Sequence, residues 1–183
     1  MAKKSTYNAK DIEVLEGLEP VRKRPGMYIG STNQDGLHHL VNEVLDNSID
    51  EVLAGHATDI SFQYKKDGSI KIKDNGRGIP IDFHPKYKNK RALEVVLTTL
   101  HAGGKFNSNA YKTSGGLHGV GISVVNALSS LLQVQVFKDG KVYRQDYSKG
   151  KVKTKIKIEK CSKKLKGTEI SFIPDESIFE ETK

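Results

Sequence analysis

The sequence predicts one α+β domain, folded as a two-layer sandwich in which helices cover one face of a mixed, mostly antiparallel sheet. Three observations lead to this prediction. The length of 183 residues suits a single domain. Apolar residues make up 36% of the chain and are spread along it, so a substantial core can be buried. The expected elements run as helices, a hairpin, helices and then several strands, an order typical of this class.

Helices are expected in three main segments. The clearest covers Asp35 to Ala54, where apolar side chains recur at helical spacing. Two more are expected over residues 91–101 and 119–129. Nearer the start of the chain, Pro20 and Pro25 are expected to interrupt a short helix, because proline lacks the backbone donor and clashes with the preceding turn.

Strands are expected in much of the remaining chain. Between residues 60 and 72, apolar side chains alternate on either side of a "KKDG" turn, which predicts a hairpin. A second turn is expected at Asp139–Gly140. Four further strands are expected in the segments "LLQVQVF", "KVYRQDY", "KVKTKIKI" and "GTEISFI".

The positive charge is concentrated in one part of the chain. The formal net charge is +8, and residues 138–166 hold eleven lysines and one arginine against three acidic residues. The rest of the chain is near neutral, so the composition does not mark the whole domain as a nucleic-acid binder. Within this segment, "KVKTKIKI" is interpreted as a strand with one solvated lysine face, and the alternative is a basic surface that faces DNA.

Composition also excludes several classes of protein. Cys161 is the only cysteine, so no intramolecular disulfide can form and a zinc site is not expected. A signal peptide is not expected, because no apolar stretch follows the first lysines, and the sequence has no apolar run of about 18 residues that would span a membrane. We therefore expect a soluble, cytoplasmic protein without a membrane partner.

The helix expected from Asp35 to Ala54 carries three polar residues on one stripe. His39, Glu43 and Asn47 follow at steps of four, and each step rotates only about 40° beyond a full turn. An imidazole, a carboxylate and an amide so placed would suit a base, the group that orients it and a metal ligand. On spacing alone, a solvated helix face is the favoured interpretation.

Two glycine-containing segments suggest contacts with a ligand. In "DNGRGIP", residues 74–80, a carboxylate ends a strand and two glycines permit close backbone approach, although an ordinary Asp-Gly turn is the alternative. "GGLHGVG", residues 115–121, precedes a helix whose free N–H groups would attract an anion, and a flexible connector is the alternative. The second segment does not match the P-loop pattern.

In this order, "EVLDNSIDE", "DNGRGIP" and "GGLHGVG" resemble the three nucleotide-binding motifs of the GHKL ATPases. "VRKRPGMYIG" and "HAGGKF" narrow the resemblance to the B subunits of bacterial type IIA topoisomerases. "IPIDFHP" and "FIPDESIFE" resemble the topoisomerase IV branch more than the gyrase branch. The resemblance implies the GHKL (Bergerat) fold with ATP and Mg²⁺ as cofactors. It also implies a dimerisation arm at residues 1–14 and an ATP-binding domain at residues 15–183, with the transducer domain of the family absent.

The resemblance assigns roles to the polar residues. Glu43 would be the general base that takes a proton from the attacking water, and His39 would orient it. Asn47 would hold Mg²⁺ against the triphosphate. Asp74 would accept a hydrogen bond from the adenine amino group and so select the base.

The remaining pocket residues follow from the same resemblance. Gly78 and Thr168 would hold an ordered water, and Glu51 and Arg77 would line the pocket mouth beside Pro80. The apolar walls would come from Val44, Ile72, Ile79, Val96 and Ile170. The phosphates would be bound by the backbone of Leu117, His118, Gly119, Val120 and Gly121. Further contacts would come from the lid residues Lys105 and Tyr111 and from the partner-crossing arm, Tyr7 and Ile12.

Partners are also implied by the resemblance. ATP binding would close two B subunits into a homodimer that captures DNA, while an A-type subunit would cut the DNA. ATP-competitive inhibitors are expected in the same pocket, and Lys138 stands where the family often has arginine, which would weaken aminocoumarin-type inhibitors. The rival classes are a histidine kinase of the same fold, a chaperone or mismatch-repair ATPase, and a non-enzymatic DNA-binding module.

Overall fold

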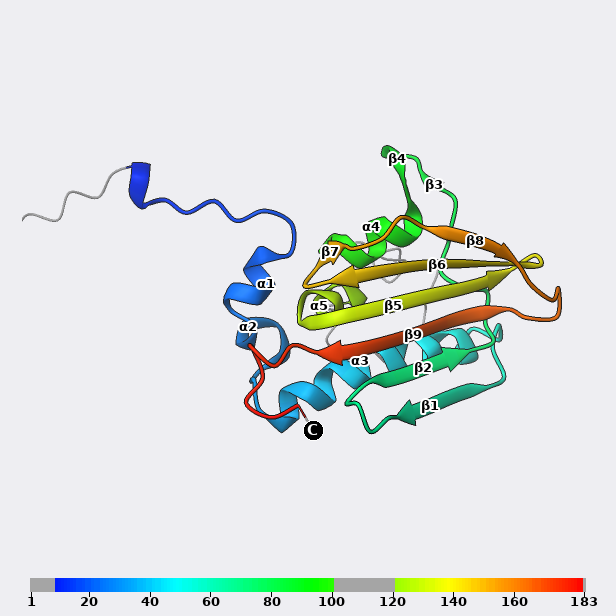
Figure 1. Ribbon diagram of the computed structural model, residues 1–183, viewed down its shortest axis with the longest axis horizontal. Helices are drawn as coiled ribbons and strands as arrows, with labels where there is room; N and C mark the ends of the chain where they lie inside the picture. Colours follow the sequence, from blue (N-terminus) through cyan, green and yellow to red (C-terminus); the bar gives the residue numbers. More distant parts are fainter. Residues whose placement is uncertain (1–8, 101–120, 183) are drawn as a thin grey trace, which may run out of the picture.

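The computed structural model describes residues 9–100 and 121–182 (Figure 1). Its helical elements are η1 (Ala9–Asp11), α1 (Glu19–Lys23), α2 (Gly26–Ile29), α3 (Gln34–Leu53), α4 (Ala92–Thr98) and α5 (Ile122–Ala127). Its strands are β1 (Ile60–Tyr64), β2 (Ile70–Asp74), β3 (Phe83–His84), β4 (Tyr87–Arg91), β5 (Ser129–Lys138), β6 (Lys141–Ser148), β7 (Lys151–Val152), β8 (Lys157–Lys160) and β9 (Gly167–Pro174).

One antiparallel sheet of seven strands forms the centre of the domain. Six strands follow the order β1-β2-β9-β5-β6-β7, and β8 pairs with β6 as well. β3 and β4 form a separate hairpin. The helices α3, α4 and α5 cover one face of the sheet (Figure 1). The predicted two-layer α+β sandwich is confirmed, and the strand pairs in the described part of the chain are all antiparallel.

The hydrophobic core lies between the helices and the sheet face that they cover. Leu40 of α3 and Val124 of α5 are fully buried and belong to one cluster with Ile72, Val134 and Ile170 of the sheet. Each such aliphatic side chain contributes about 1.5–3 kcal/mol on burial. Packing against the covered face of the sheet therefore holds the helices in position.

Helix α3 matches its prediction closely, since it covers Gln34–Leu53 where Asp35 to Ala54 was expected. Its start is fixed by Asn33, whose side chain accepts a hydrogen bond from the Asp35 amide at 2.9 Å. This is the usual arrangement of an N-terminal cap. After the helix, Gly55 adopts a φ of 81°, which glycine reaches without steric cost.

Other elements differ from the sequence prediction in extent. Within the described residues, α4 and α5 are shorter than the expected helices. Pro20 does not interrupt a helix but lies in the first turn of α1, where a missing N–H costs nothing. "KVKTKIKI" forms two short strands, β7 and β8, rather than one. The turn at Asp139–Gly140 is confirmed, and both residues have positive φ, as tight hairpin turns require.

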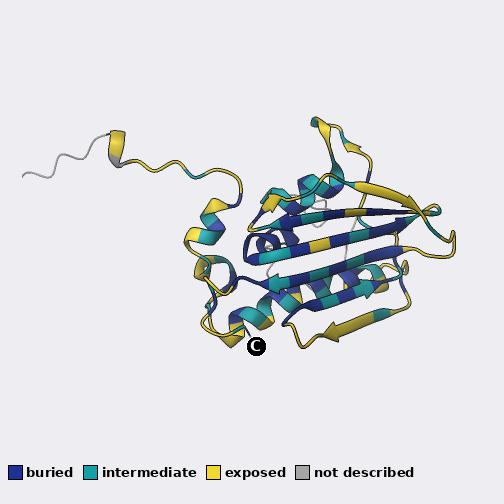
Figure 2. Cartoon of the chain, viewed as in Figure 1, coloured by how far each residue is buried: buried dark blue, intermediate teal, exposed yellow. Residues whose placement is uncertain are grey.

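The two edges of the sheet are the most exposed part of it. Figure 2 shows buried residues along β9, β5 and β6 and exposed residues along β1 and β8.

Within the described residues, no helix is long and apolar enough to cross a membrane.

A buried carboxylate joins the N-terminal helix to the end of β9. Oδ2 of Asp175 accepts a hydrogen bond from Arg22 at 2.8 Å, and a second Arg22 nitrogen donates to the carbonyl of Ala127 at 2.8 Å. Oδ1 of Asp175 accepts from both the amide and the hydroxyl of Ser177. Burial raises the pKa of Asp175, but the hydrogen bonds from Ser177 and Arg22 outweigh it and hold the pKa below its ordinary value of 3.8.

We predict that Asp175→Asn lowers the free energy of unfolding near neutral pH by about 1.5–3 kcal/mol, the range for hydrogen bonds to charged groups. Because the pKa of Asp175 is lower in the folded state, its contribution is complete above about pH 4 and is lost as the pH falls through the folded-state value. The melting temperatures of the unchanged chain and of Asp175→Asn should therefore converge in acid. The exposed neighbour Glu176 supplies the control, Glu176→Gln. A gap in melting temperature that stays constant with pH would contradict this role.

Candidate active site

The polar stripe of α3 places an imidazole against a carboxylate. Nε2 of His39 lies 3.5 Å from Oε1 of Glu43, one turn further along the helix. Glu43 is 4% exposed, and both His39 and Asn47 are half-buried. The stripe therefore faces the interior of the domain, and the solvated-face interpretation is wrong.

The other oxygen of Glu43 contacts the backbone that leads into α5. Oε2 accepts a hydrogen bond from the Gly121 amide at 3.1 Å. Gly121 has a φ of 84° and is the last residue before α5 begins at Ile122. The carboxylate of α3 thus lies beside the end of the glycine-rich segment that was predicted to bind phosphate.

Asp74 ends β2 as a buried carboxylate, 6% exposed, held from three directions. Its Oδ2 accepts from the Ser48 hydroxyl at 2.8 Å. Its Oδ1 accepts from the amides of Gly76 at 2.9 Å and Thr168 at 3.5 Å. An ionised carboxylate offers about four acceptor positions, so one remains for a donor on a ligand. The geometry suits recognition of an amino group by a fixed acceptor.

The loop after β2 is fastened to α3 by a planar ion pair. Arg77 donates to Glu51 through Nη2 at 2.7 Å, Nε at 3.2 Å and its backbone amide at 2.9 Å. Burial raises the pKa of Glu51, but the hydrogen bonds from Arg77 outweigh it and hold the pKa below its ordinary value. The predicted pair of Glu51 and Arg77 is therefore present, with Pro80 exposed further along the same loop.

Two glycines permit the close approach of backbone segments around Asp74. Gly167 has a φ of 110°, and a Cβ built there would lie 2.0 Å from the carbonyl oxygen of Asp74. Gly78 has a φ of 81°, and a Cβ there would lie 2.8 Å from Val136. No other residue fits either position without displacing its neighbours. Between them, the Ile79 amide donates to Oγ1 of Thr168 at 3.0 Å, which locks the loop to β9.

The predicted apolar walls are gathered in the core beneath these groups. Three of them are buried and two are partly buried against the same cluster: Val44, Ile72 and Ile170, and then Ile79 and Val96. Several other expected contacts lie outside the described residues, namely Tyr7, Lys105, Tyr111, Leu117, His118, Gly119 and Val120.

Sequence reasoning missed Ser48 and Asn75. Ser48 is buried on α3 one turn after Val44, and its hydroxyl supplies the only side-chain hydrogen bond to Asp74 among the described residues. The available signal was a hydroxyl on the apolar face of a helix, where burial demands a partner. Asn75 accepts hydrogen bonds from the amides of Thr58 and Asp59, and so anchors the loop beside β1.

The donors present fit a magnesium ion that arrives with a phosphate ligand. The described residues contain no group of three or more His, Cys, Asp or Glu that could hold a metal by themselves. The Asn47 amide lies one turn after Glu43 and makes no hydrogen bond to the described part of the chain. An amide oxygen is a suitable hard ligand, and Mg²⁺ usually completes its shell with waters and phosphate oxygens.

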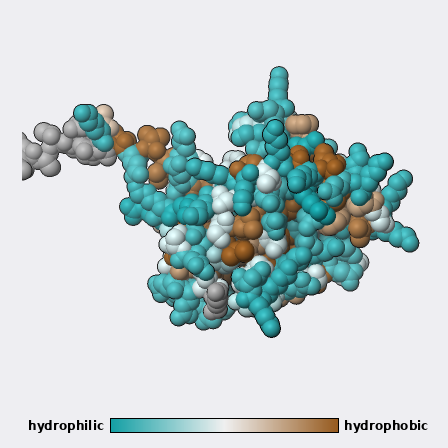
Figure 3. All heavy atoms as spheres, viewed as in Figure 1, coloured by the Kyte–Doolittle hydropathy of each residue, from teal (hydrophilic) through white to brown (hydrophobic). Residues whose placement is uncertain are grey.

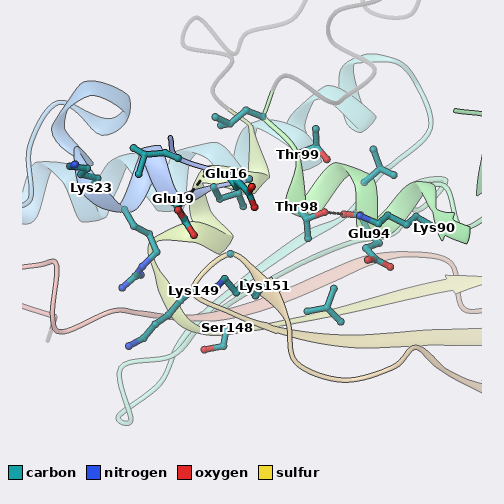
Figure 4. A pocket seen from close by; sticks show the side chains of 18 of the residues that line it. Glu16, Glu19, Lys23, Lys90, Glu94, Thr98, Thr99, Ser148, Lys149 and Lys151 are labelled. Carbon is teal, nitrogen blue, oxygen red and sulfur yellow. Dashed lines mark hydrogen bonds between the residues drawn. The ribbon is translucent and has the colours of Figure 1, made fainter. Parts of the chain in front are cut away.

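A separate cleft of about 1230 Å³ lies away from these residues (Figure 4). The segment 13–23, β4, the end of α4 and the turn between β6 and β7 line it with both acidic and basic side chains. None of the predicted site residues belongs to it. Its size alone gives it no chemical role, and the convergent groups around Glu43 and Asp74 mark the candidate site instead.

Comparisons with known proteins identify a family for this chain. The family described as "Histidine kinase-, DNA gyrase B-, and HSP90-like ATPase" matches residues 32–178. The B subunit of DNA topoisomerase 4 from Rickettsia bellii is 65% identical over 96% of the chain, which spans 26% of that relative. The B subunit of DNA gyrase from Thermotoga maritima is 58% identical over 96% of the chain and 27% of the relative. The chain thus spans about a quarter of the length of these curated relatives.

Solved structures give the same result. The 43K ATPase domain of Thermus thermophilus gyrase B, in complex with an aminocoumarin, superimposes with a TM-score of 0.77 and 44% identity over 90% of this chain and 40% of that one. The topoisomerase IV ATP-binding domain of Francisella tularensis, with a small-molecule inhibitor, gives a TM-score of 0.77 and 43% identity over 93% and 44% of the chains. Because the family model matches most of its length, this chain belongs to the family of histidine kinase-, DNA gyrase B- and HSP90-like ATPases.

Proposed function

We propose that this chain binds and hydrolyses ATP to drive the clamp of a bacterial type II DNA topoisomerase, as the ATPase domain of a topoisomerase IV B subunit. The observation that carries the proposal is the pair of carboxylates tied to one helix: Glu43 lies on α3, and Asp74 is held by Ser48 of α3. The first would transfer a proton and the second would recognise the base. Calorimetric titration with ATP, followed by assay of phosphate release with Mg²⁺, tests the proposal directly.

Asp74 supports selection of adenine. The exocyclic amino group of adenine is a donor, whereas guanine carries an acceptor at the corresponding position. A buried carboxylate with a free acceptor position would pair with the first and repel the second. The Thr168 amide donates to Asp74, and the Ile79 amide, next to Gly78, donates to the Thr168 hydroxyl, which is consistent with an ordered water between the base and these groups.

Glu43 supports base catalysis by its position. The imidazole of His39 lies against one oxygen, and the Gly121 amide fixes the other. The Glu43 carboxylate is thus oriented from both sides before substrate binds. It would take a proton from a water aligned with the terminal phosphate, while the backbone before α5 holds the phosphate oxygens.

Asn47 supports a Mg²⁺ ion bound together with the nucleotide. Bound Mg²⁺ would neutralise charge on the phosphate oxygens. Asn47 places its amide one turn beyond Glu43, so α3 presents the base and the ligand along the same stripe.

The partners are proposed from the relatives. Topoisomerase B subunits would form a homodimer on ATP binding, capture DNA and act with a DNA-cleaving A-type subunit. The topoisomerase IV assignment rests on identity, because five Rickettsia relatives of that name are 62–65% identical and two gyrase relatives are 57–58% identical. The ATPase domain of a gyrase B subunit is the second candidate. ATP-competitive inhibitors would enter the same pocket, with Lys138 half-buried at the end of β5.

We predict that Asp74→Asn weakens ATP binding by about 1.5–3 kcal/mol, or roughly ten- to a hundred-and-sixty-fold, the range for hydrogen bonds to charged groups. Asparagine keeps the size of the side chain but replaces one acceptor by a donor. Calorimetry gives the measurement. The control is Asp67→Asn, because Asp67 accepts the same kind of turn hydrogen bonds from Ser69 far from the site. Unchanged affinity in Asp74→Asn would place the adenine elsewhere.

We predict that Glu43→Gln keeps ATP binding but lowers the hydrolysis rate of the full-length enzyme by roughly 10²–10⁴-fold, the usual contribution of a general base. Glutamine still accepts the Gly121 hydrogen bond, so the local structure should survive. Phosphate release is the readout. Glu159→Gln, an exposed change on β8, serves as the control. Near-normal turnover in Glu43→Gln would remove this residue from the role.

A further inference from the structure

The sheet edge opposite β1 carries a dense row of lysines. We define the lysine strip as the exposed residues Lys151, Lys153, Lys155, Lys157 and Lys160. The surrounding segment, residues 151–166, contains eight lysines and a single acidic residue, Glu159. Most of the net charge of +8 therefore lies in sixteen consecutive residues. Figure 3 shows hydrophilic side chains projecting along the part of the surface where β8 lies.

The backbone beneath the lysine strip is fixed along β6. β8 pairs with the first half of β6 and β7 with its end, so the strip follows most of that strand. Between the two short strands, Thr154 bridges the gap: its Oγ1 accepts from the Asp146 amide at 3.0 Å, and its carbonyl accepts from Gln145 at 3.2 Å. The lysines of the strip are thus carried on an ordered edge of the sheet.

These lysines form no ion pairs with the part of the chain that the structure describes. Glu159 is 3.8 Å from Arg144 and so is shared with another cation. None of the five strip lysines has an ion-pair partner within residues 9–100 and 121–182. Lysines nearby on the sheet differ, since Lys71 pairs with Glu169 and Lys149 lies near Asp175.

Protection of an edge strand does not account for this density of charge. Lysine on an edge strand discourages pairing with another chain. The opposite edge strand, β1, reads ISFQY and carries no charged residue at all. The sheet thus leaves one edge without charge and gives the other five lysines. Five like charges on one edge repel one another, and that repulsion is relieved when a polyanion binds.

We propose that the lysine strip binds the phosphate backbone of duplex DNA, independently of base sequence. Alternate residues of an extended segment are about 6.6 Å apart, so Lys151 to Lys157 covers at most about 20 Å. Duplex DNA presents about one phosphate charge per 1.7 Å of its axis, so this length meets about six base pairs. The inference rests on the proposed function, in which the domain closes on DNA, and it assigns that contact to a particular edge.

Fluorescence anisotropy with a labelled duplex of about 20 base pairs tests the inference, over a salt range of about 50–200 mM. The chain is compared with Lys155→Glu/Lys157→Glu and with the charge-matched control Lys65→Glu/Lys66→Glu. Both control lysines are exposed in the turn after β1, at the other edge of the sheet. We expect the strip variant to bind at least about tenfold more weakly, with the slope of log K against log salt reduced by about 2. The control should stay within about twofold.

Equal losses in both variants would show that only net charge matters and would overturn the proposal. Absence of duplex binding by the unchanged chain at low salt would overturn it as well, as would tighter binding of an oligoglutamate peptide than of the duplex. ATP affinity, measured on all three chains, distinguishes failure of the lysine-strip proposal from failure of the proposed ATPase function. Unchanged ATP binding with selective loss of DNA binding supports the strip, whereas failure of every chain to bind ATP refutes the proposed function and leaves the DNA comparison readable.

Discussion

The hydrogen bonds around the Asp74 carboxylate organise the whole site. A buried carboxylate must be satisfied by donors, and here they come from three separate parts of the chain: Ser48 of α3, the Gly76 amide of the following loop and the Thr168 amide of β9. The same contact requires glycine at position 167, where a Cβ would collide with the Asp74 carbonyl. One side chain therefore sets how the main helix, the loop and the central strand lie against each other.

Helix α3 connects the two halves of the proposed chemistry because it contributes to both. Glu43 and Ser48 are five residues apart, or about 7.5 Å along the helix axis. Glu43 reaches the backbone before α5, and Ser48 reaches the end of β2. Since Leu40 and Val44 bury the same helix in the core, the distance between the two ends of the site is fixed by packing rather than by a flexible loop.

The sequence was most informative where local periodicity or a local cap determines the structure. The extent of α3 followed from its apolar spacing. Its first residue is set by the N-terminal cap at Asn33. The roles of the site residues were implied by the order of the motifs. The distances between these residues could be known only from the folded structure. The role of Ser48 was not predicted, because its partner Asp74 is 26 residues away in the sequence. A hydroxyl on a helix does not by itself indicate which carboxylate it will donate to. The sequence did not predict that "KVKTKIKI" forms two strands, because the interruption depends on pairing with β6. Between the Tyr147–Val152 and Arg144–Lys157 pairs, β6 advances by three residues and the segment from β7 to β8 advances by five, so the segment cannot pair continuously.

The distribution of charge separates the two tasks that the domain is proposed to perform. Around Asp74 and Glu43, each carboxylate has its own donors, so the site is electrostatically prepared before a nucleotide arrives. On the far edge of the sheet, the lysines have no such partners among the described residues, and their attraction for a polyanion would weaken with salt. The strand β6 lies between these regions: Val136 of its neighbour β5 packs beside Gly78, while β8 on its other side carries the strip. Both regions are therefore built on one sheet, with the carboxylates at the β2 and β9 side and the lysines along β6.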